Sequence, residues 1–462
     1  MMFRLRSRVA IPASVVRSSV LFVLVIALVG VGLVVTRVPP VLVPLAVVAP
    51  LVAFLALRRL EYRVLALVVT AAFVRVSLPT GTNSRIVASL LMTAVLIMIW
   101  IIEMLVRDKK LHLTPSSTNV PLLAFILTAV ISYVWSNAFR DPLVIVWHTW
   151  PFVQLGGLAV MVLLPGAFLL VVNSISEVRS LRWLYWLMVC IGVLSLVDHV
   201  LPISLPFLNT GGLFSLWFVS LTYAQALFNK RLPLWLRLIL LGVAGVWMYI
   251  YFVTWVTWLS GWLPPLAAIG TVSLLRSKKL FLIFVLLMLV YVGLNLDYYI
   301  GTVLERETAE SGLSRLDAWA HNWQVTSKHL LFGTGPAGYA AYYMSYFPTD
   351  AMATHSNYID VLSQTGIVGL FFCLWFFGSL GWTGYKACMR LTGSGDFSEG
   401  FAVATLGGWA GCVVAMALGD WLFPFVYTQT IAGFDYAVYS WVLLGGMVAL
   451  ANIHATGKAV PV

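Results

Sequence analysis

A helix start late in the chain places a cationic side chain where anions bind. Ser314 and Asp317 fit the S-x-x-D form of a capping box. Arg315 should therefore lie in the first turn of a helix, where unpaired amides and the helix dipole favour an anion. Trp319 and Asn322 share its face by i, i+4, i+7 spacing. A guanidinium here suits a phosphate or pyrophosphate. A solvated arginine on an ordinary amphipathic helix is the alternative.

A histidine follows forty residues later, directly before the apolar run 358–381. His355 should sit at the start of a transmembrane helix, where the helix dipole disfavours imidazolium, so its ring should be mostly neutral. A neutral imidazole beside a hydroxyl is a candidate general base. An interfacial histidine that caps the helix is the structural alternative. A zinc site built from His355, His321 and Asp360 is not favoured, and we expect no metal.

The composition limits which elements can position these groups. The chain has 462 residues, of which 61% are hydrophobic and 10% charged, with a formal net charge of +11. Soluble domains are about a quarter charged, so a soluble enzyme is excluded, as is a disordered chain. The basic residues lie in short clusters between long apolar runs. We therefore attribute the excess positive charge to basic loops that orient the protein in the membrane, and we expect no nucleic-acid partner.

Apolar runs long enough to cross a bilayer recur along the chain. They predict an all-α, polytopic transmembrane helical bundle of 12–14 spans. The short run 41–57, which contains Pro44 and Pro50, and the block 234–275 are the least certain. The runs are 19–36, 41–57, 62–78, 86–106, 120–136, 152–172, 183–201, 212–228, 234–250, 255–275, 280–296, 358–381, 401–419 and 435–451.

The basic residues predict the orientation of these spans. With both termini in the cytoplasm, 21 of the 28 Lys and Arg residues fall on the cytoplasmic side. One long loop, 297–357, then faces outward and carries both chemical segments, and its aromatic residues indicate that it folds against the membrane. We divide the chain into N-terminal spans (1–296), an extracytoplasmic catalytic loop with short helices (297–357) and C-terminal spans (358–462). No ATP-binding or dinucleotide motif is present.

Positive charge is scarce on the predicted outer side, so each outer arginine is a candidate ligand for an anion. Arg75 interrupts the run 62–78 near its outer end, and intramembrane arginines are costly and usually functional. Snorkelling to the interface is its alternative role. Arg85 and Arg140 are further substrate-binding candidates, although a structural role is favoured for each. Asp198 ends a span on the same side and could shape an acceptor cleft, as could Asp420.

Three ordered segments resemble the O-antigen ligase and O-antigen polymerase superfamily. They are an S-x-R-x-x-x-W-type segment at 311–319, an L-x-G-x-G-x-x-x-Y segment at 331–339 and an H-S-x-Y-I segment that continues to two glycines at 355–369. They cover about sixty residues in the order that the family has. The late outer loop and the many spans extend the resemblance over most of the chain.

The resemblance implies a membrane glycosyltransferase of the GT-C type in the bacterial cytoplasmic membrane. Such enzymes transfer a glycan from an undecaprenyl-pyrophosphate carrier to a lipid A core, another glycan repeat or a protein hydroxyl. They invert the anomeric carbon and need neither metal nor cofactor. His355 matches the family histidine that positions or deprotonates the acceptor, and Arg315 matches an arginine proposed to hold pyrophosphate. Trp319 and Asn357, beside these residues, are expected to bind substrate.

One position departs from the family pattern. The family carries a second arginine in a helix before the large loop, and Ser260 stands where it is expected. Arg75 is the best substitute. A secondary transporter or lipid-linked glycan flippase is the alternative function, although the charges here lie at span ends and not along a midplane pathway.

Overall fold

The computed structural model describes residues 60–80, 84–200, 208–254, 259–301, 315–349 and 353–455. The chain divides into two compact units, Met1–Ala66 and Leu67–Val462. Of the first unit only 60–66, the start of helix α3 (Leu60–Phe73), is described. The predicted runs 19–36 and 41–57 lie outside the described residues, as does the predicted N-cap Ser314. Everything below concerns the second unit.

The described chain is almost entirely helical. Eight of its helices are long and apolar enough to cross a membrane, because each comes from an uninterrupted apolar run. The predicted polytopic helical bundle is therefore confirmed. These spans are formed by α4 (Ala88–Glu103) with η2 (Met104–Asp108), α5 (Asn119–Ala138), α6 (Trp150–Ser174), α7 (Val178–Val200), α9 (Leu234–Tyr249) with η3 (Ile250–Thr254), α16 (Asn357–Leu391), α17 (Phe397–Leu418) and η6 (Ile431–Gly433) with α18 (Phe434–Ala455).

Other predicted runs form helices that fall short of these criteria. They are α8 (Phe214–Phe228), α10 (Leu259–Arg276) and α11 (Lys278–Leu294). The run 62–78 differs from expectation, because α3 ends at Phe73 and the chain then pairs as a hairpin. Strand β1 (Ser77–Pro79) lies antiparallel to β2 (Arg85–Val87), with Leu78 opposite Ile86. Arg75 therefore lies in the connection between α3 and β1, not within a helical span.

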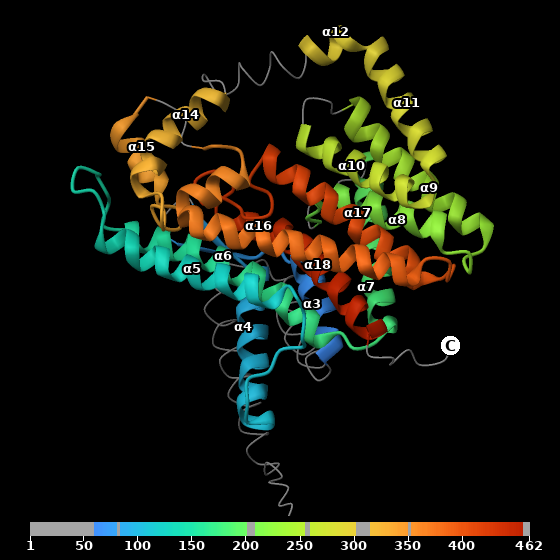
Figure 1. The fold of residues 1–462 in the computed structure, drawn as a ribbon, viewed down its shortest axis with the longest axis horizontal. Coiled ribbons are helices and arrows are strands. Elements are labelled where there is room, and N and C mark those ends of the chain that lie inside the picture. Colours follow the sequence, from blue (N-terminus) through green and yellow to red (C-terminus); the bar gives the residue numbers. More distant parts are fainter. Residues whose placement is uncertain are drawn as a thin grey trace, which may run out of the picture. The chain divides into compact units, whose positions relative to one another are not determined.

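The helices pack closely around α17 and α18. Helix α17 lies beside α8, α10 and α16, and α18 lies beside α6; α16 also runs along α5 (Figure 1). Small residues permit this approach: a Cβ on Gly411 of α17 would lie 2.7 Å from the Pro264 carbonyl of α10. Helix α17 is thus closely packed against its neighbours.

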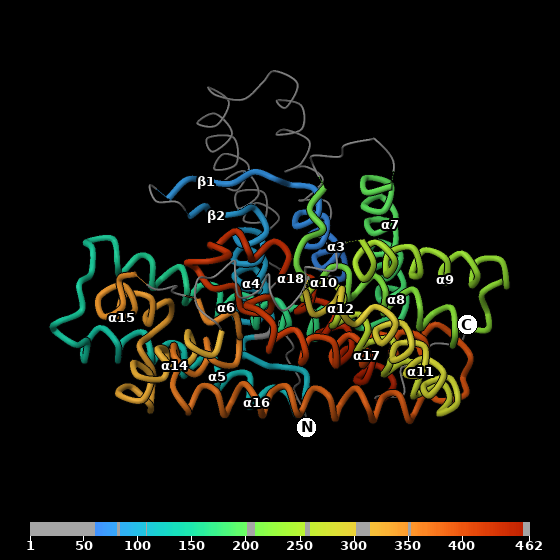
Figure 2. Tube along the Cα trace, turned by 90° about the horizontal axis from the view of Figure 1, so that it is seen from above, coloured from blue at the N-terminus to red at the C-terminus, as the bar shows by residue number. Residues whose placement is uncertain are grey.

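The long predicted loop contains short helices, as expected. They are α12 (Leu296–Tyr299), α14 (Arg315–Thr326), η5 (Ser327–His329) and α15 (Tyr339–Tyr346). Helices α14 and α15 contact each other, and α14 contacts α16 (Figures 1 and 2). Tyr342 of α15 packs in a buried cluster with Val144, Trp150 and Val325, and Tyr339 stacks on Phe425 with ring centroids 4.5 Å apart. Helices α14 and α15 are therefore packed onto the helical body.

Helix α16 is broken at Gly366, whose φ of 69° and ψ of −173° are not helical. The break frees carbonyls before it and amides after it, and the loop between η5 and α15 pairs with them. The Thr334 amide donates to the Ser363 carbonyl at 2.9 Å, and the Ile367 amide donates to the Leu330 carbonyl at 2.8 Å. Irregular backbone inside a membrane bundle is tolerated where protein satisfies it in this way.

Glycines make this pairing possible. A Cβ on Gly366 would lie 2.2 Å from the Leu331 carbonyl oxygen, and one on Gly333 (φ +69°) would lie 2.5 Å from the Gln364 carbonyl carbon. Ser132 of α5 donates to the Gln364 carbonyl at 2.5 Å. The glycine pair at 333 and 335, a weak signal in the sequence, thus belongs to the contact that holds the loop on α16.

Candidate functional site

The C-terminal end of α17 is where the two predicted chemical segments meet. The Leu418 carbonyl accepts a hydrogen bond from Arg315 Nη1 at 3.4 Å and from Ser260 Oγ at 3.2 Å. Arg315 is the first residue of α14, as predicted. Because a helix C-terminus carries partial negative charge, it attracts and orients a guanidinium. A guanidinium carries five N–H donors in a planar fork, a donor set that suits a phosphate or pyrophosphate.

The turn that carries His355 is attached to the same end of α17. Ser356 Oγ donates to the Met416 carbonyl at 3.4 Å, and the Asn357 amide donates to the Gly419 carbonyl at 3.3 Å. His355 lies immediately before these two residues. Arg315 and His355 are therefore both held at the last turn of α17, although forty residues separate them in sequence.

His355 has an unusual backbone. Its φ is +50°, a left-handed conformation that non-glycine residues rarely adopt. Its neighbours Thr354 and Ser356 are buried, with 1% and 3% of their surfaces exposed, whereas His355 is exposed. The turn therefore buries the flanking residues and presents the imidazole outward. Such strain is often found at functional sites, where the surrounding structure maintains it.

Two predicted substrate-binding residues lie in this group but face protein. Trp319 Nε1 donates to the Thr354 carbonyl at 2.8 Å, which connects α14 to the His355 turn. Asn357 is fully buried, and its side chain donates to the Phe423 carbonyl at 2.8 Å while accepting from the Leu422 amide at 3.0 Å. These contacts favour positioning roles for both residues.

The segment after α17 is ordered by a buried carboxylate. Asp420 accepts hydrogen bonds from the Phe425 amide at 3.0 Å and from Thr428 Oγ1 at 2.5 Å, with 3% of its surface exposed. Asp420 and Asn357 together fix the segment that follows α17. The sequence interpretation gave Asp420 a minor role in shaping an acceptor cleft, and its hydrogen bonds show a local one within the protein.

Arg75 lies on a different element. Its guanidinium donates to the Leu208 carbonyl and is close enough to Asp435 to interact with that charge. Asp435 also accepts from Asn209 Nδ2 at 3.3 Å and from Ser89 Oγ at 2.5 Å. These contacts hold the chain after α3 against the segment before α8 and against α18.

The remaining predicted residues have other neighbours. Arg85 is exposed on β2, next to Ser84, whose hydroxyl accepts from the Ile431 amide at 3.3 Å. Arg140 is exposed after α5, and Asp198 lies in the last turn of α7. The described contacts thus group Arg315, Trp319, His355 and Asn357 at the end of α17, and they place Arg75, Arg85, Arg140 and Asp198 on other elements.

Polar contacts also fix α15 beside the connection between α5 and α6. The Tyr346 hydroxyl donates to Asp141 at 2.6 Å, and this hydrogen bond lowers the pKa of Asp141. His329, at the end of η5, stacks edge-on against Tyr342 at 4.9 Å, and its burial lowers its pKa. None of these four residues makes a described contact with the end of α17. We therefore assign this cluster a structural role in holding α15.

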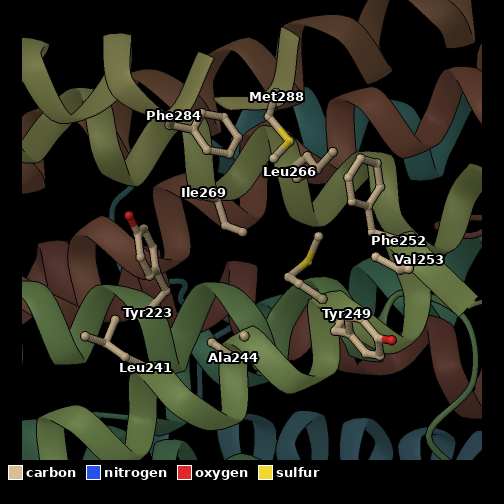
Figure 3. A pocket seen from close by; sticks show the side chains of 12 residues that line it. Tyr223, Leu241, Ala244, Tyr249, Phe252, Val253, Leu266, Ile269, Phe284 and Met288 are labelled. Carbon is tan, nitrogen blue, oxygen red and sulfur yellow. The ribbon is translucent and has the colours of Figure 1, made fainter. Parts of the chain in front are cut away.

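An apolar pocket of about 340 Å³ lies between α8, α9 with η3, α10 and α11 (Figure 3). Tyr249, Phe252, Leu266 and Met288 line it. The ring of Phe252 packs on Trp262 with centroids 5.0 Å apart. Helix α10, which contributes Leu266 and Ile269 to the pocket, also carries Trp262 and Ser260.

Sequence reasoning gave no separate role to Thr354 or Tyr339 and considered Asp360 only as a metal ligand. Asp360 is 2% exposed and accepts from the Tyr339 hydroxyl at 2.6 Å and from Thr354 Oγ1 at 2.6 Å. The sequence did contain a signal for Asp360: it is a carboxylate inside the apolar run 358–381, and ionisable groups within membrane spans are costly and usually functional. In the described part of the chain, no three His, Cys, Asp or Glu residues gather as metal ligands.

Comparison with known proteins bears on the same region. Residues 208–374 match the family model described as O-antigen ligase. No curated protein matches the chain. The matched region contains Ser260, Arg315, His355 and the broken part of α16, and it includes all three segments on which the sequence resemblance rests. Residues 208–374 of this multi-pass membrane protein are therefore similar to the O-antigen ligase family.

Proposed function

We propose that this protein is a membrane glycosyltransferase that transfers a glycan from undecaprenyl pyrophosphate to an acceptor hydroxyl. The reaction takes place on the outer face of the bacterial cytoplasmic membrane, with both chain termini in the cytoplasm. The acceptor belongs to a lipid A core, a second glycan repeat or a protein. The observation that carries the proposal is the attachment of Arg315 and of the His355 turn to one end of α17.

Arg315 stabilises the leaving group in this mechanism. As the bond from the anomeric carbon to the pyrophosphate oxygen breaks, negative charge grows on the departing polyprenyl pyrophosphate. A preorganised cation in a partly buried site lowers the energy of that charge, usually the largest catalytic contribution. The bond to the Leu418 carbonyl supports this role, because it fixes the guanidinium before substrate binds.

His355 acts on the acceptor. Its neutral imidazole accepts the proton as the acceptor oxygen attacks the anomeric carbon from the side opposite the pyrophosphate, which inverts the configuration. Such general-base assistance contributes about 10² to 10⁴ in rate. The exposed position of His355 beside two buried, anchored residues supports this role. The mechanism requires no metal, because Arg315 and the N-terminus of α14 supply the positive charge.

The donor lipid occupies the apolar pocket beside η3. Polyprenyl chains are purely hydrocarbon, and the pocket is lined by apolar and aromatic side chains (Figure 3). Helix α10 lines this pocket and also carries Ser260, whose hydroxyl donates to the Leu418 carbonyl. Arg75 remains the candidate second cation for the donor in place of the arginine absent at Ser260, while Arg85, Arg140 and Asp198 remain candidates for glycan contacts.

Proteoliposomes that contain the purified protein and radiolabelled lipid-linked glycan test the proposal. Glycan joined to an added acceptor, with release of polyprenyl pyrophosphate, supports the transferase. Movement of the lipid-linked glycan across the bilayer without transfer contradicts it and favours a transporter or flippase.

A further inference from the structure

The left-handed backbone of His355 needs neighbours that hold it. A non-glycine residue at φ +50° is strained, and the strain persists only where surrounding contacts fix the conformation. The residue before His355, Thr354, is 1% exposed and makes contacts in three directions. Those contacts decide where the imidazole points.

The side chain of Thr354 closes the turn and attaches it to a carboxylate. Its Oγ1 donates to Asp360 Oδ1 at 2.6 Å and accepts from the Ser356 amide at 3.3 Å. These two hydrogen bonds connect Thr354, directly before the strained His355, to residues that follow it. Asp360 is itself fixed, because the same oxygen accepts from the Tyr339 hydroxyl at 2.6 Å. Tyr339 is fully buried and stacks on Phe425. The acceptor that Thr354 uses therefore cannot easily move.

The backbone of Thr354 attaches the turn to the helix of Arg315. The Thr354 carbonyl accepts from Trp319 Nε1 at 2.8 Å. Trp319 lies four residues after Arg315 in α14 and so stands one turn along the same face. Thr354 is thus bonded to α14 through its carbonyl and to α16 through its hydroxyl.

From these contacts we infer that Thr354 is a positioning residue that sets His355 relative to Arg315. The inference rests on the proposed function, since it assumes that these two side chains act on one substrate. A misplacement of about 1 Å in such a pair can reduce the rate by roughly 10²-fold. Loss of the Thr354 hydroxyl should therefore reduce turnover more than donor binding.

Thr354→Val and Thr354→Ser separate positioning from simple stabilisation. Valine keeps the shape and removes the hydroxyl, whereas serine keeps the hydroxyl. We expect kcat for glycan transfer to fall roughly 10²-fold in Thr354→Val with donor KM nearly unchanged, and Thr354→Ser to restore kcat to near the wild-type value. Thr405→Val is the matched control, because Thr405 is also fully buried but its hydroxyl bonds only to carbonyls of its own helix.

A second measurement makes the test independent of activity. Hydrogen exchange followed by mass spectrometry should show faster exchange of the Ser356 amide in Thr354→Val than in the wild type, and no change in Thr405→Val. Unchanged exchange at Ser356, or a wild-type kcat per folded molecule in Thr354→Val, overturns the inference. Absence of transfer by the wild-type protein contradicts the proposed function instead, and the exchange result then still decides whether Thr354 holds the turn.

Discussion

Ser260 and Arg315 donate hydrogen bonds to the same backbone oxygen, that of Leu418 at the end of α17. The resemblance predicts the family's second arginine at the position of Ser260, and this predicted departure lies beside the candidate pyrophosphate ligand. A hydroxyl here supplies a hydrogen bond but no charge. Arg315 consequently carries the positive charge at this carbonyl in the described part of the chain.

Replacing Arg315 should affect the chemical step most. Arg315→Lys keeps the charge but loses the planar fork that binds two phosphate oxygens at once. We expect kcat to fall by about 10² to 10³, the range found when one transition-state donor is removed. The measurement is steady-state transfer from lipid-linked glycan.

Lys328→Arg is the matched control for Arg315→Lys, because it also exchanges one cation for another in the same loop. Lys328 belongs to the same loop but lies over the Tyr346 ring, 5.7 Å from its centroid. This variant should keep wild-type transfer. Equal losses in the two variants would mean that any exchange of one cation for another in the loop lowers transfer, and that the position of Arg315 has no special role.

The break in α16 should tolerate only glycine. Gly366→Ala adds a Cβ that meets the Leu331 carbonyl oxygen in a left-handed conformation, so we expect the free energy of unfolding to fall by about 1–3 kcal/mol or more. Gly378→Ala lies in the same helix with no atom within 4 Å of the added Cβ. This control should gain about 0.5–1 kcal/mol from its higher helix propensity. Thermal unfolding in detergent distinguishes the two, and equal melting temperatures would show that the break is not required.

Several features of this structure could be read from the sequence, and others could not. Apolar runs from 86 onward predict the described helices, because burial in lipid demands long uninterrupted segments. The start of α14 at Arg315 followed from local capping rules. The break at Gly366 was missed, since the predicted span 358–381 runs through it and contains no proline.

The contacts at the end of α17 were beyond sequence reasoning for a different reason. Ser260 and Arg315 contact Leu418 across 158 and 103 residues of sequence. No local sequence pattern predicts a contact between residues so far apart. The role of Thr354 also depends on two other helices. Sequence analysis found His355 and Arg315 as chemical groups, but their shared anchor required the packed structure.

Filling the apolar pocket should weaken donor binding. Gly245 lines it and has open space beside its Cα, so Gly245→Phe can place a ring inside. Excluding about two methylenes of the polyprenyl chain costs roughly 1.6 kcal/mol, which raises donor KM roughly tenfold. The effect should be smaller for a donor with a short prenyl chain.

Gly242→Phe is the matched control for this pocket. Gly242 lies on the same helix with equally open space, but it is not a lining residue. Its donor KM should stay at the wild-type value. If both variants bind long-chain donor as the wild type does, the polyprenyl chain lies elsewhere.

The most direct test of the account is transfer by His355→Ala in proteoliposomes with radiolabelled lipid-linked glycan and excess acceptor. Circular dichroism and gel filtration first establish that the variant is folded and inserted. The account predicts that the wild type joins glycan to the acceptor and releases polyprenyl pyrophosphate, while His355→Ala loses about 10² to 10⁴ of this rate and still binds donor. Wild-type transfer by a folded His355→Ala protein would contradict it.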